Sequence, residues 1–409
     1  MLGCNIMMKK RIFISMHYME IGGAEISLIG LLHAFDYSRY DVDLFIHSHR
    51  GELMGKIPNE VNLLPEIHEY AQIERPIAQV LKDGYWRIAL ARLKAKWQYK
   101  KYAQTMHPKD GAAIFQYIDY AVLPLLPSLE KFGTYDLAIS FLMPHGIVLN
   151  KVDAKKRVAW IHTDYTHIDT NATLEKPIWE GYDHIAAISE EAAKAFLTVH
   201  PALRSKVIVV ENILSPAFVR ERAKACEEKE IEKEMPRKDG ETILLSVGRY
   251  TAAKNYDNVP DICRRMMNNG VNVKWYIIGF GGDEKLIRQK IAEQGMEKQV
   301  ILLGKRTNPY PYMQRCDIYV QPSRYEGKSV TVREAQMLCK PVAITNYTTA
   351  VSQVQNGVDG VIMPLDNEGC ANALAAFIQD KEKQATITAY LQQHDYGNMD
   401  AVKIVEEMA

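Results

Sequence analysis

Short apolar runs alternate along the whole chain with longer segments in which apolar residues recur at helical spacing. This alternation is typical of a parallel β-sheet covered by helices. In the first half, strands are predicted at residues 11–16, 42–47, 136–141, 157–162, 184–189 and 207–210. In the second half, they are predicted at residues 242–247, 273–279, 300–303, 318–321, 342–345 and 360–363. Because the pattern occurs twice, we expect two Rossmann-like α/β domains.

A charged segment separates the two halves. Residues 220–240 (RERAKACEEKEIEKEMPRKDG) are dense in charge and poor in large apolar side chains, which suits a solvated helix followed by a linker. We therefore expect an N-terminal domain at 1–215 and a C-terminal domain at 216–409, with the final helix a candidate to cross back to the N-terminal domain. Two such domains facing each other form a cleft, and sheets of this kind bind ligands at the carboxyl ends of their strands.

The strongest chemical signal is the segment PSRYEGKSVTVREAQMLCKP at 322–341. A strand runs into a short loop that holds Glu326, and the helix that follows carries Glu334 about one turn from its start. Both carboxylates can then face a ligand at the helix N-terminus, where backbone N–H groups favour a diphosphate. Those N–H groups belong to Lys328, Ser329, Val330 and Thr331. The simpler interpretation is that Glu334 caps its own helix while Glu326 is a solvated loop residue.

Two cations follow the first predicted strand of the second half. In SVGRYTAAKNYD (246–257), the strand ends at Val247, Gly248 makes a turn, and Arg249 and Lys254 come next. Cations just past a strand end can clamp a diphosphate and neutralise it as it leaves. A surface arginine and lysine are common, but here both fall where a sheet of this kind binds ligands.

Two weaker signals lie in the first half. Gly22 and Gly23 follow the first strand and precede a helix, where glycine lets the backbone approach a phosphate or sugar closely. A plain strand-to-helix turn explains them equally well, because the segment is not GxGxxG. His162, at the carboxyl end of a predicted strand, can touch a sugar hydroxyl, although a lone histidine is more often structural.

Taken together, these four segments resemble the retaining family-4 glycosyltransferases of the GT-B fold, of the bacterial group 1 type. The resemblance covers nearly the whole chain and is strongest from 242 to 365, which holds YIIGFGGDEKLIRQKIAEQG, VILLGK and CDIYVQPSRYEG in the family's usual order. It implies an N-terminal acceptor-binding domain and a C-terminal nucleotide-sugar-binding domain, facing each other across a cleft. One departure is Gly327, Lys328 and Ser329, where the family commonly has glycine, aromatic, glycine; Lys328 adds charge near the donor sugar.

The resemblance also implies roles for these residues. Glu334 would hold the ribose hydroxyls of the nucleotide, and Glu326 would hydrogen-bond to the donor sugar. Arg249 and Lys254 would bind the diphosphate, and His162 would lie beside the transferred sugar. The phosphates would contact Gly22 and Gly23, and the nucleotide base would contact backbone groups at Lys305 and Arg306. Asn212 matches the segment in which the family crosses between its two domains.

Composition removes several other classes of protein. The 409 residues have a formal net charge of +0, so no global field attracts the chain to nucleic acid. None of the 6 cysteines forms a CxxC pair or has zinc spacing with histidine, which is typical of reduced cytoplasmic thiols. No apolar run approaches the ~20 residues that span a bilayer. Asp41 and Asp43 form a DxD that precedes an apolar strand instead of following one, so we predict no metal. We also expect no cofactor, because the nucleotide-sugar is a substrate.

A basic helix is predicted at residues 85–102 (YWRIALARLKAKWQYKKY). One narrow apolar stripe holds Trp86, Leu90, Leu93 and Trp97. Its basic flanks are Lys94 and Lys101 on one side and Arg92, Lys96 and Lys100 on the other. This arrangement suits a helix lying in an anionic membrane surface. A helix packed on the N-terminal domain, with solvated basic sides, explains it equally well.

These observations lead to one predicted function and two alternatives. The predicted function is transfer of a hexose-type sugar, with retention, from a UDP- or GDP-linked donor to a saccharide or lipid-linked saccharide in surface polysaccharide synthesis. The expected place is the cytoplasm, including the inner face of the membrane. The alternatives are a GT-B sugar-nucleotide epimerase or phosphorylase, and a non-catalytic membrane-associated subunit. An NAD oxidoreductase is disfavoured because neither half opens with GxGxxG.

Overall fold

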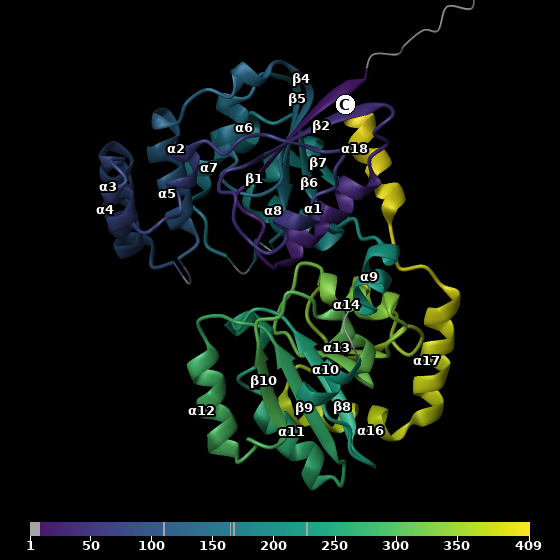
Figure 1. Ribbon diagram of the computed structural model, residues 1–409. Helices are drawn as coiled ribbons and strands as arrows, with labels where there is room; N and C mark the ends of the chain where they lie inside the picture. Colours follow the sequence, from purple (N-terminus) through teal and green to yellow (C-terminus); the bar gives the residue numbers. More distant parts are fainter. Residues whose placement is uncertain (1–8, 109–110, 164, 167, 226–227) are drawn as a thin grey trace, which may run out of the picture. The chain divides into compact units, whose positions relative to one another are not determined.

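The computed structural model describes residues 9–108, 111–163, 165–166, 168–225 and 228–409 (Figure 1). The chain forms two compact units. The N-terminal unit runs to Ile213 and also includes Met399–Ala409, whereas the C-terminal unit is Leu214–Asn398. Each unit contains one parallel β-sheet with helices packed against it, so the predicted α/β class with two Rossmann-like domains is confirmed.

The sheet of the N-terminal unit has the strand order β3-β2-β1-β4-β5-β6-β7. Its strands are β1 (Lys10–Met16), β2 (Tyr40–Ile46), β3 (Asn62–Leu63), β4 (Tyr135–Ser140), β5 (Ala154–Ile161), β6 (His184–Ala187) and β7 (Val207–Val209). Consecutive residues of the inner strand β1, such as Ile12, Phe13 and Ile14, are fully buried. Burial on both faces explains why these strands read as continuous apolar runs in the sequence.

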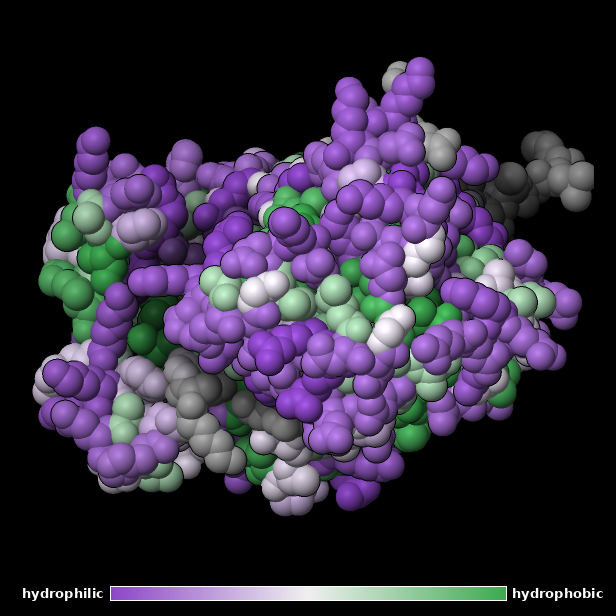
Figure 2. Space-filling view, turned by 90° about the horizontal axis from the view of Figure 1, so that it is seen from below, coloured by the Kyte–Doolittle hydropathy of each residue, from purple (hydrophilic) through white to green (hydrophobic). Residues whose placement is uncertain are grey.

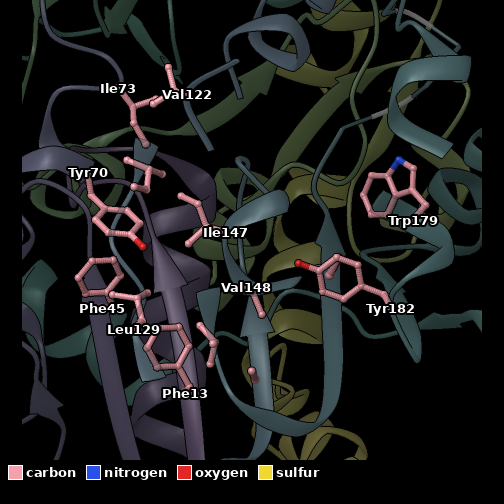
Figure 3. Close-up of a cluster of buried hydrophobic side chains, with 14 of the residues drawn as sticks. Phe13, Phe45, Tyr70, Ile73, Val122, Leu129, Ile147, Val148, Trp179 and Tyr182 are labelled. Carbon is pink, nitrogen blue, oxygen red and sulfur yellow. The ribbon is translucent and has the colours of Figure 1, made fainter. Parts of the chain in front are cut away.

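Nine helices of this unit lie among the described residues. They are α1 (Gly23–Ala34), α2 (His68–Ala71), α3 (Ile77–Lys82), α4 (Trp86–Met106), α5 (Ala113–Val122), α6 (Gly146–Lys151), α7 (Ala172–Glu180), α8 (Glu190–Val199) and α18 (Val402–Met408). Between helices and sheet lies an aromatic-rich core, in which Phe45 stacks on Phe13 and meets Tyr70 edge-on (Figure 3). The final helix α18 belongs to this unit, where Glu406 accepts a hydrogen bond from the Asp36 N–H.

The C-terminal unit has a sheet of order β10-β9-β8-β11-β12-β13. Its strands are β8 (Thr242–Val247), β9 (Val273–Ile278), β10 (Val300–Gly304), β11 (Ile318–Gln321), β12 (Val342–Thr345) and β13 (Val361–Met363). Its helices are α9 (Pro216–Ala223), α10 (Glu228–Glu234), α11 (Val259–Asn268), α12 (Glu284–Gln294), α13 (Tyr310–Arg315), α14 (Val330–Met337), α15 (Ala350–Gln353), α16 (Asn367–Gln379) and α17 (Lys381–Gln393). Because β8 lies between β9 and β11, the loops that follow β8 and β11 emerge at the same edge of the sheet.

Two expectations need correction here. The short edge strand β3 was not predicted, because Asn62 and Leu63 are both exposed and form no apolar run. The charged segment 220–240 is not one solvated helix with a linker. It contains the end of α9 and the whole of α10, and Ile231 and Met235 are buried where α10 packs against α13. Two apolar residues are enough to fix a short helix once a neighbouring surface exists to receive them.

The basic helix is α4, and the structure exposes its predicted apolar stripe. Exposed side chains on it are Trp86, Leu90, Leu93 and Trp97, together with Lys94, Lys96, Lys100 and Lys101. We call these eight residues the α4 surface. In Figure 2, hydrophobic side chains gather at the left-hand edge of the molecule. Helices α3 and α4 lie on the same side in Figure 1.

Arg92 does not belong to this surface, which corrects the predicted basic flank. Its side chain is buried, and its Nη1 donates to the carbonyl oxygens of Gln72 and Arg75 at 2.8 and 2.6 Å. Helix α4 therefore turns Arg92 toward the loop before α3, where it ties the helix to the unit.

Candidate active site

The centre of the candidate site is a carboxylate that receives three hydrogen bonds. Glu326 follows β11, and its Oε1 lies 2.5 Å from Lys254 Nζ, 2.9 Å from Gln321 Nε2 and 2.6 Å from Ser323 Oγ. The ion pair is largely shielded, with side-chain exposures of 19% for Lys254 and 12% for Glu326. Glu326 is therefore not a solvated loop residue. An anion and a cation are held together at the carboxyl ends of β8 and β11, a pairing that the sequence did not predict.

The loops that carry this pair are tied to each other. Arg324 forms a two-pronged ion pair with Asp257 at 2.9 and 2.7 Å, and its backbone N–H donates to the Ala253 carbonyl at 2.8 Å. Asn255 adopts a left-handed conformation, with φ of 60°, and its amide donates to the Pro322 carbonyl at 2.9 Å. These bonds fix Lys254 at the end of a short 3₁₀ turn, Ala252–Lys254, so the lysine is positioned before any ligand arrives.

A close backbone contact supports the loop from the side of β9. An ideal Cβ built on Gly279 would lie 1.9 Å from the Gly248 carbonyl oxygen and 2.8 Å from the Tyr250 ring. The Gly279 N–H donates to Gly304 O at 3.0 Å. Only a residue without a side chain fits here, because the obstructing atom belongs to the backbone and cannot rotate away.

We expect Gly279→Ala to lower the free energy of unfolding by ~1–3 kcal/mol, because overpacking against backbone forces the β8 loop to shift. Gly282→Ala is a matched control, since a Cβ there meets nothing within 4 Å. Urea denaturation of both variants measures the difference. Equal stability of the two would show that the β8 loop yields freely and does not hold Lys254 in place.

Glu334 lies in a separate environment from Glu326. It is the fifth residue of α14 and only 2% exposed, and its Oε1 accepts a hydrogen bond from the Tyr310 hydroxyl at 2.7 Å. Burial raises the pKa of the Glu334 carboxyl to about 7. The carboxylate therefore does not cap its own helix. It is held by α13, and near neutral pH it exists partly in its protonated form.

The N-terminus of α14 carries the predicted anion-binding amides. The Ser329 N–H donates to Gln353 Oε1 at 3.1 Å, so this amide already has an acceptor within the protein. The Thr331 hydroxyl accepts from the Tyr319 hydroxyl at 2.7 Å and contacts Ser329 Oγ at 3.0 Å. Lys328 lies in the preceding loop, and Val330 begins the helix. Helix-start amides other than that of Ser329 are the ones that remain suited to an anion.

Two of the three remaining predicted cations lie near one aromatic ring. The Arg249 guanidinium lies 5.9 Å and the Lys305 ammonium 4.8 Å from the centre of the Phe280 ring. Arg306 differs, because its guanidinium binds Glu234 at 2.6 Å and the Tyr312 hydroxyl at 3.0 Å. Its side chain thus anchors α10. Loops that follow β8, β9 and β10 converge at Phe280, a residue that the sequence did not single out.

The predicted residues of the N-terminal unit lie at the carboxyl ends of its strands. Burial lowers the pKa of His162 to about 3, and the ring hydrogen-bonds to the backbone of Phe141. Gly22 and Gly23 begin α1, but an ideal Cβ on Gly22 would lie 2.3 Å from Glu25 Oε2. A Cβ at Gly22 would meet only the end of the Glu25 side chain, so this contact alone does not require glycine.

The DxD lies inside β2. Asp43 accepts hydrogen bonds from Arg11 at 2.9 Å, Tyr135 at 2.6 Å and Asn62 at 2.8 Å, while Asp41 pairs with Lys9 at 3.1 Å. Both carboxylates of the DxD are therefore bound by residues in or next to neighbouring strands of the sheet. Across the described ranges, no group of three or more histidine, cysteine, aspartate and glutamate side chains has the arrangement of a metal site.

Several residues of the site were missed from sequence. They are the partners of the predicted carboxylates and loops: Gln321, Ser323, Tyr310, Asp257, Arg324 and Phe280. Gln321 and Ser323 stand within five positions of Glu326, so the strand-end polar cluster QPSRYE was a usable local signal. Tyr310 gave no such signal, because it reaches Glu334 from another helix.

The comparisons with known proteins agree with this geometry. Residues 227–394 match the family model of glycosyl transferases group 1. Amylovoran biosynthesis glycosyltransferase AmsK of Erwinia amylovora is 29% identical over 143 residues, which are 33% of this chain and 34% of AmsK. Capsular polysaccharide biosynthesis glycosyltransferase CapM of Staphylococcus aureus is 26% identical over 205 residues, 50% of this chain and 54% of CapM. The matched regions thus span between a third and about half of these relatives.

Solved structures extend the similarity to both units. HepE from Anabaena, in a complex with UDP and glucose, has a TM-score of 0.69 at 16% identity and covers 98% of this chain and 99% of its own. Sucrose-phosphate synthase from Thermosynechococcus elongatus has a TM-score of 0.65 at 15% identity, with 98% of each chain covered. The chain therefore has the GT-B fold, and most of its C-terminal unit is similar to group 1 glycosyl transferases over residues 227–394.

Proposed function

We propose that this protein is a retaining, metal-independent glycosyltransferase that moves a hexose-type sugar from a UDP- or GDP-linked donor to a saccharide or lipid-linked saccharide hydroxyl. The observation that carries the proposal is the shielded Lys254–Glu326 pair at the carboxyl ends of β8 and β11, inside the region that matches group 1 glycosyltransferases. Relatives in amylovoran and capsular polysaccharide biosynthesis support a role in building a surface polysaccharide.

Donor binding is assigned to the C-terminal unit. Glu334 would accept the ribose hydroxyls, and Glu326 would accept a hydroxyl of the donor sugar. Lys254 and Arg249 would bind the diphosphate together with backbone amides at Lys328, Val330 and Thr331. The base would lie against the loop at Lys305 and Arg306. A UDP donor is favoured because HepE was solved with UDP and glucose.

The chemistry asked of these groups is modest. When the bond between the anomeric carbon and the diphosphate breaks, negative charge develops on the diphosphate oxygens. Fixed cations stabilise that charge without having to reorganise. The departing oxygen can take the proton of the acceptor hydroxyl on the same face, so the sugar keeps its configuration and no protein nucleophile is required.

Incubation with nucleotide-sugars tests the function directly. We expect release of free UDP or GDP to depend on added acceptor and to survive EDTA, because cations of the protein occupy the place that a metal ion otherwise takes. Product NMR should show the anomeric configuration of the donor. Turnover that stops in EDTA and returns with Mn²⁺ or Mg²⁺ would refute the metal-independent mechanism. Epimerised donor or free sugar phosphate, with no transfer, would favour the epimerase or phosphorylase alternative.

We also propose that the protein works at the inner face of the membrane, with the α4 surface in contact with anionic lipid. The support is the exposed apolar stripe between lysines, in which Lys101 Nζ lies 3.6 Å from the centre of the Trp97 ring. No helix among the described residues has the length and apolarity that a membrane span needs. Contact through one amphipathic face therefore accounts for the pattern.

Removing charge from the α4 surface should weaken vesicle binding. We expect the quadruple change of Lys94, Lys96, Lys100 and Lys101 to Ser to reduce binding to anionic vesicles, since each basic residue contributes ~1 kcal/mol at such a surface. A matched control changes Lys285, Lys298, Lys381 and Lys383, which are exposed on the C-terminal unit. Sedimentation with vesicles at low salt is the measurement. Equal loss in both variants, or no sedimentation of the unaltered protein, would leave α4 as a packed surface helix.

A further inference from the structure

A cavity of about 460 Å³ lies within the N-terminal unit. It opens at the carboxyl ends of β1, β4 and β5 and is walled by α4, α5 and α7. This volume falls in the range of small-molecule sites. Its wall is mainly apolar and includes Phe115, Ile118, Met143, Trp160, Ile168 and Ile178. A saccharide alone would leave much of this apolar wall without a partner. The wall therefore favours a ligand that carries apolar groups.

One end of the cavity is polar and incompletely hydrogen-bonded. His162 Nε2 and Trp160 Nε1 are buried and have no hydrogen-bond partner. Because the His162 ring bonds to the Phe141 backbone through its other nitrogen, Nε2 is left as an acceptor. The indole N–H of Trp160 can only donate. Hydroxyl groups both donate and accept, so a hydroxylated head group suits these two unpartnered nitrogens.

The mouth of the cavity exposes apolar side chains to solvent. Phe115 on α5 is 55% exposed and Met143 after β4 is 43% exposed, and both also line the cavity. Helix α5 packs along α4, which contributes Arg92 to the cavity wall on its buried side and the α4 surface on its exposed side. The cavity mouth and the α4 surface are thus parts of one helix pair.

We propose that this cavity binds an amphiphilic acceptor, with a non-reacting hydroxyl of its head group at His162 and Trp160 and the first part of an acyl or isoprenoid chain against Phe115 and Met143. This deepens the proposed function and rests on it for the identity of the ligand as the acceptor. The proposal requires that the acceptor carry an apolar chain. The protein would bind the first part of this chain, so the chain would not lie wholly in the membrane. Chain length should then contribute directly to affinity.

A matched ligand series isolates the contribution of the chain. Methyl, hexyl and octyl β-glucoside share one head group and are titrated below their micellar concentrations, with binding followed by calorimetry. We expect about fourfold tighter binding for each methylene that enters the cavity, and at least a tenfold difference between methyl and octyl glucoside. Equal binding of all three would overturn the proposal, because a purely saccharide site gains nothing from the chain.

Variants at exposed positions locate the binding without endangering the fold. The double change Phe115→Asp with Met143→Asp should remove most of the chain-length dependence and leave methyl glucoside binding unchanged. Tyr120→Asp is the matched control, because Tyr120 is on the same helix and 65% exposed but does not line the cavity. Loss of the dependence in Trp86→Ser with Trp97→Ser, but not in the cavity variant, would place the chain on the α4 surface and overturn the proposal.

These outcomes are separable from failure of the proposed function. UDP binding and transfer assays report on the C-terminal unit, whereas the glucoside series requires no turnover. A protein that binds UDP and transfers sugar but shows no chain-length dependence keeps its proposed function and loses this inference. A protein that shows the dependence at Phe115 but binds no nucleotide retains an amphiphile site without the proposed reaction.

Discussion

Lys254→Ala is expected to lower kcat by ~10²–10³-fold, the loss typical of removing one group that stabilises developing charge. The donor KM should change much less. The reason is that negative charge grows on the leaving diphosphate during the reaction, so a fixed cation gains interaction energy in the transition state. Steady-state kinetics with the donor varied at saturating acceptor measures both constants.

Two further variants sharpen this test. Lys254→Arg should recover only part of the activity, because a planar guanidinium does not fill the place of an ammonium 2.5 Å from Glu326. Lys285→Ala removes an exposed lysine of the same unit and should leave kcat unchanged. If Lys254→Ala kept kcat and only raised KM, the lysine would be a simple binding residue. A product of inverted configuration would require a base that the site does not provide.

Glu334→Gln is expected to weaken UDP binding by ~1–3 kcal/mol, because an amide replaces only part of the hydrogen bonding that a carboxylate offers to two ribose hydroxyls. Tyr310 can still donate to the amide oxygen, so the fold should be preserved. Isothermal calorimetry with UDP and GDP measures the loss. Glu297→Gln, at an exposed position of the same unit, is the control. Unchanged affinity for both nucleotides would refute the ribose role.

The raised pKa of Glu334 adds a pH dependence with a defined sign. Burial favours the protonated form, and its pKa of about 7 means that the carboxylate becomes fully available only above neutral pH. If ribose hydroxyls bind the ionised form, affinity for UDP-glucose should rise as pH increases through about 7 and then level off. In Glu334→Gln this rise should be absent. A flat profile in the unaltered protein would show that ribose does not contact this carboxylate.

Local sequence was sufficient for most strands and for placing polar and charged residues at their ends. Buried parallel strands must be apolar on both faces, so β8, β11 and β12 could be placed from their runs alone. The parallel topology then places the loop with Lys254 beside the loop with Glu326, since ligand-binding loops of such sheets gather at the carboxyl ends. Edge strand β3 escaped prediction because Asn62 and Leu63, both exposed, need no apolar pattern.

Only the tertiary structure decided the burial, the pKa and the hydrogen-bond partners of the predicted residues. In the sequence, Arg92 is one of five basic residues predicted to flank the apolar stripe of α4. In the structure, packing buries Arg92 against two carbonyl oxygens and leaves the four lysines exposed. The sequence made Glu326 and Glu334 a matched pair, but the fold gave one a lysine and the other a buried tyrosine. The physical reason is that periodicity depends on neighbours along the chain, whereas burial, pKa and hydrogen-bond partners depend on residues brought together from distant segments.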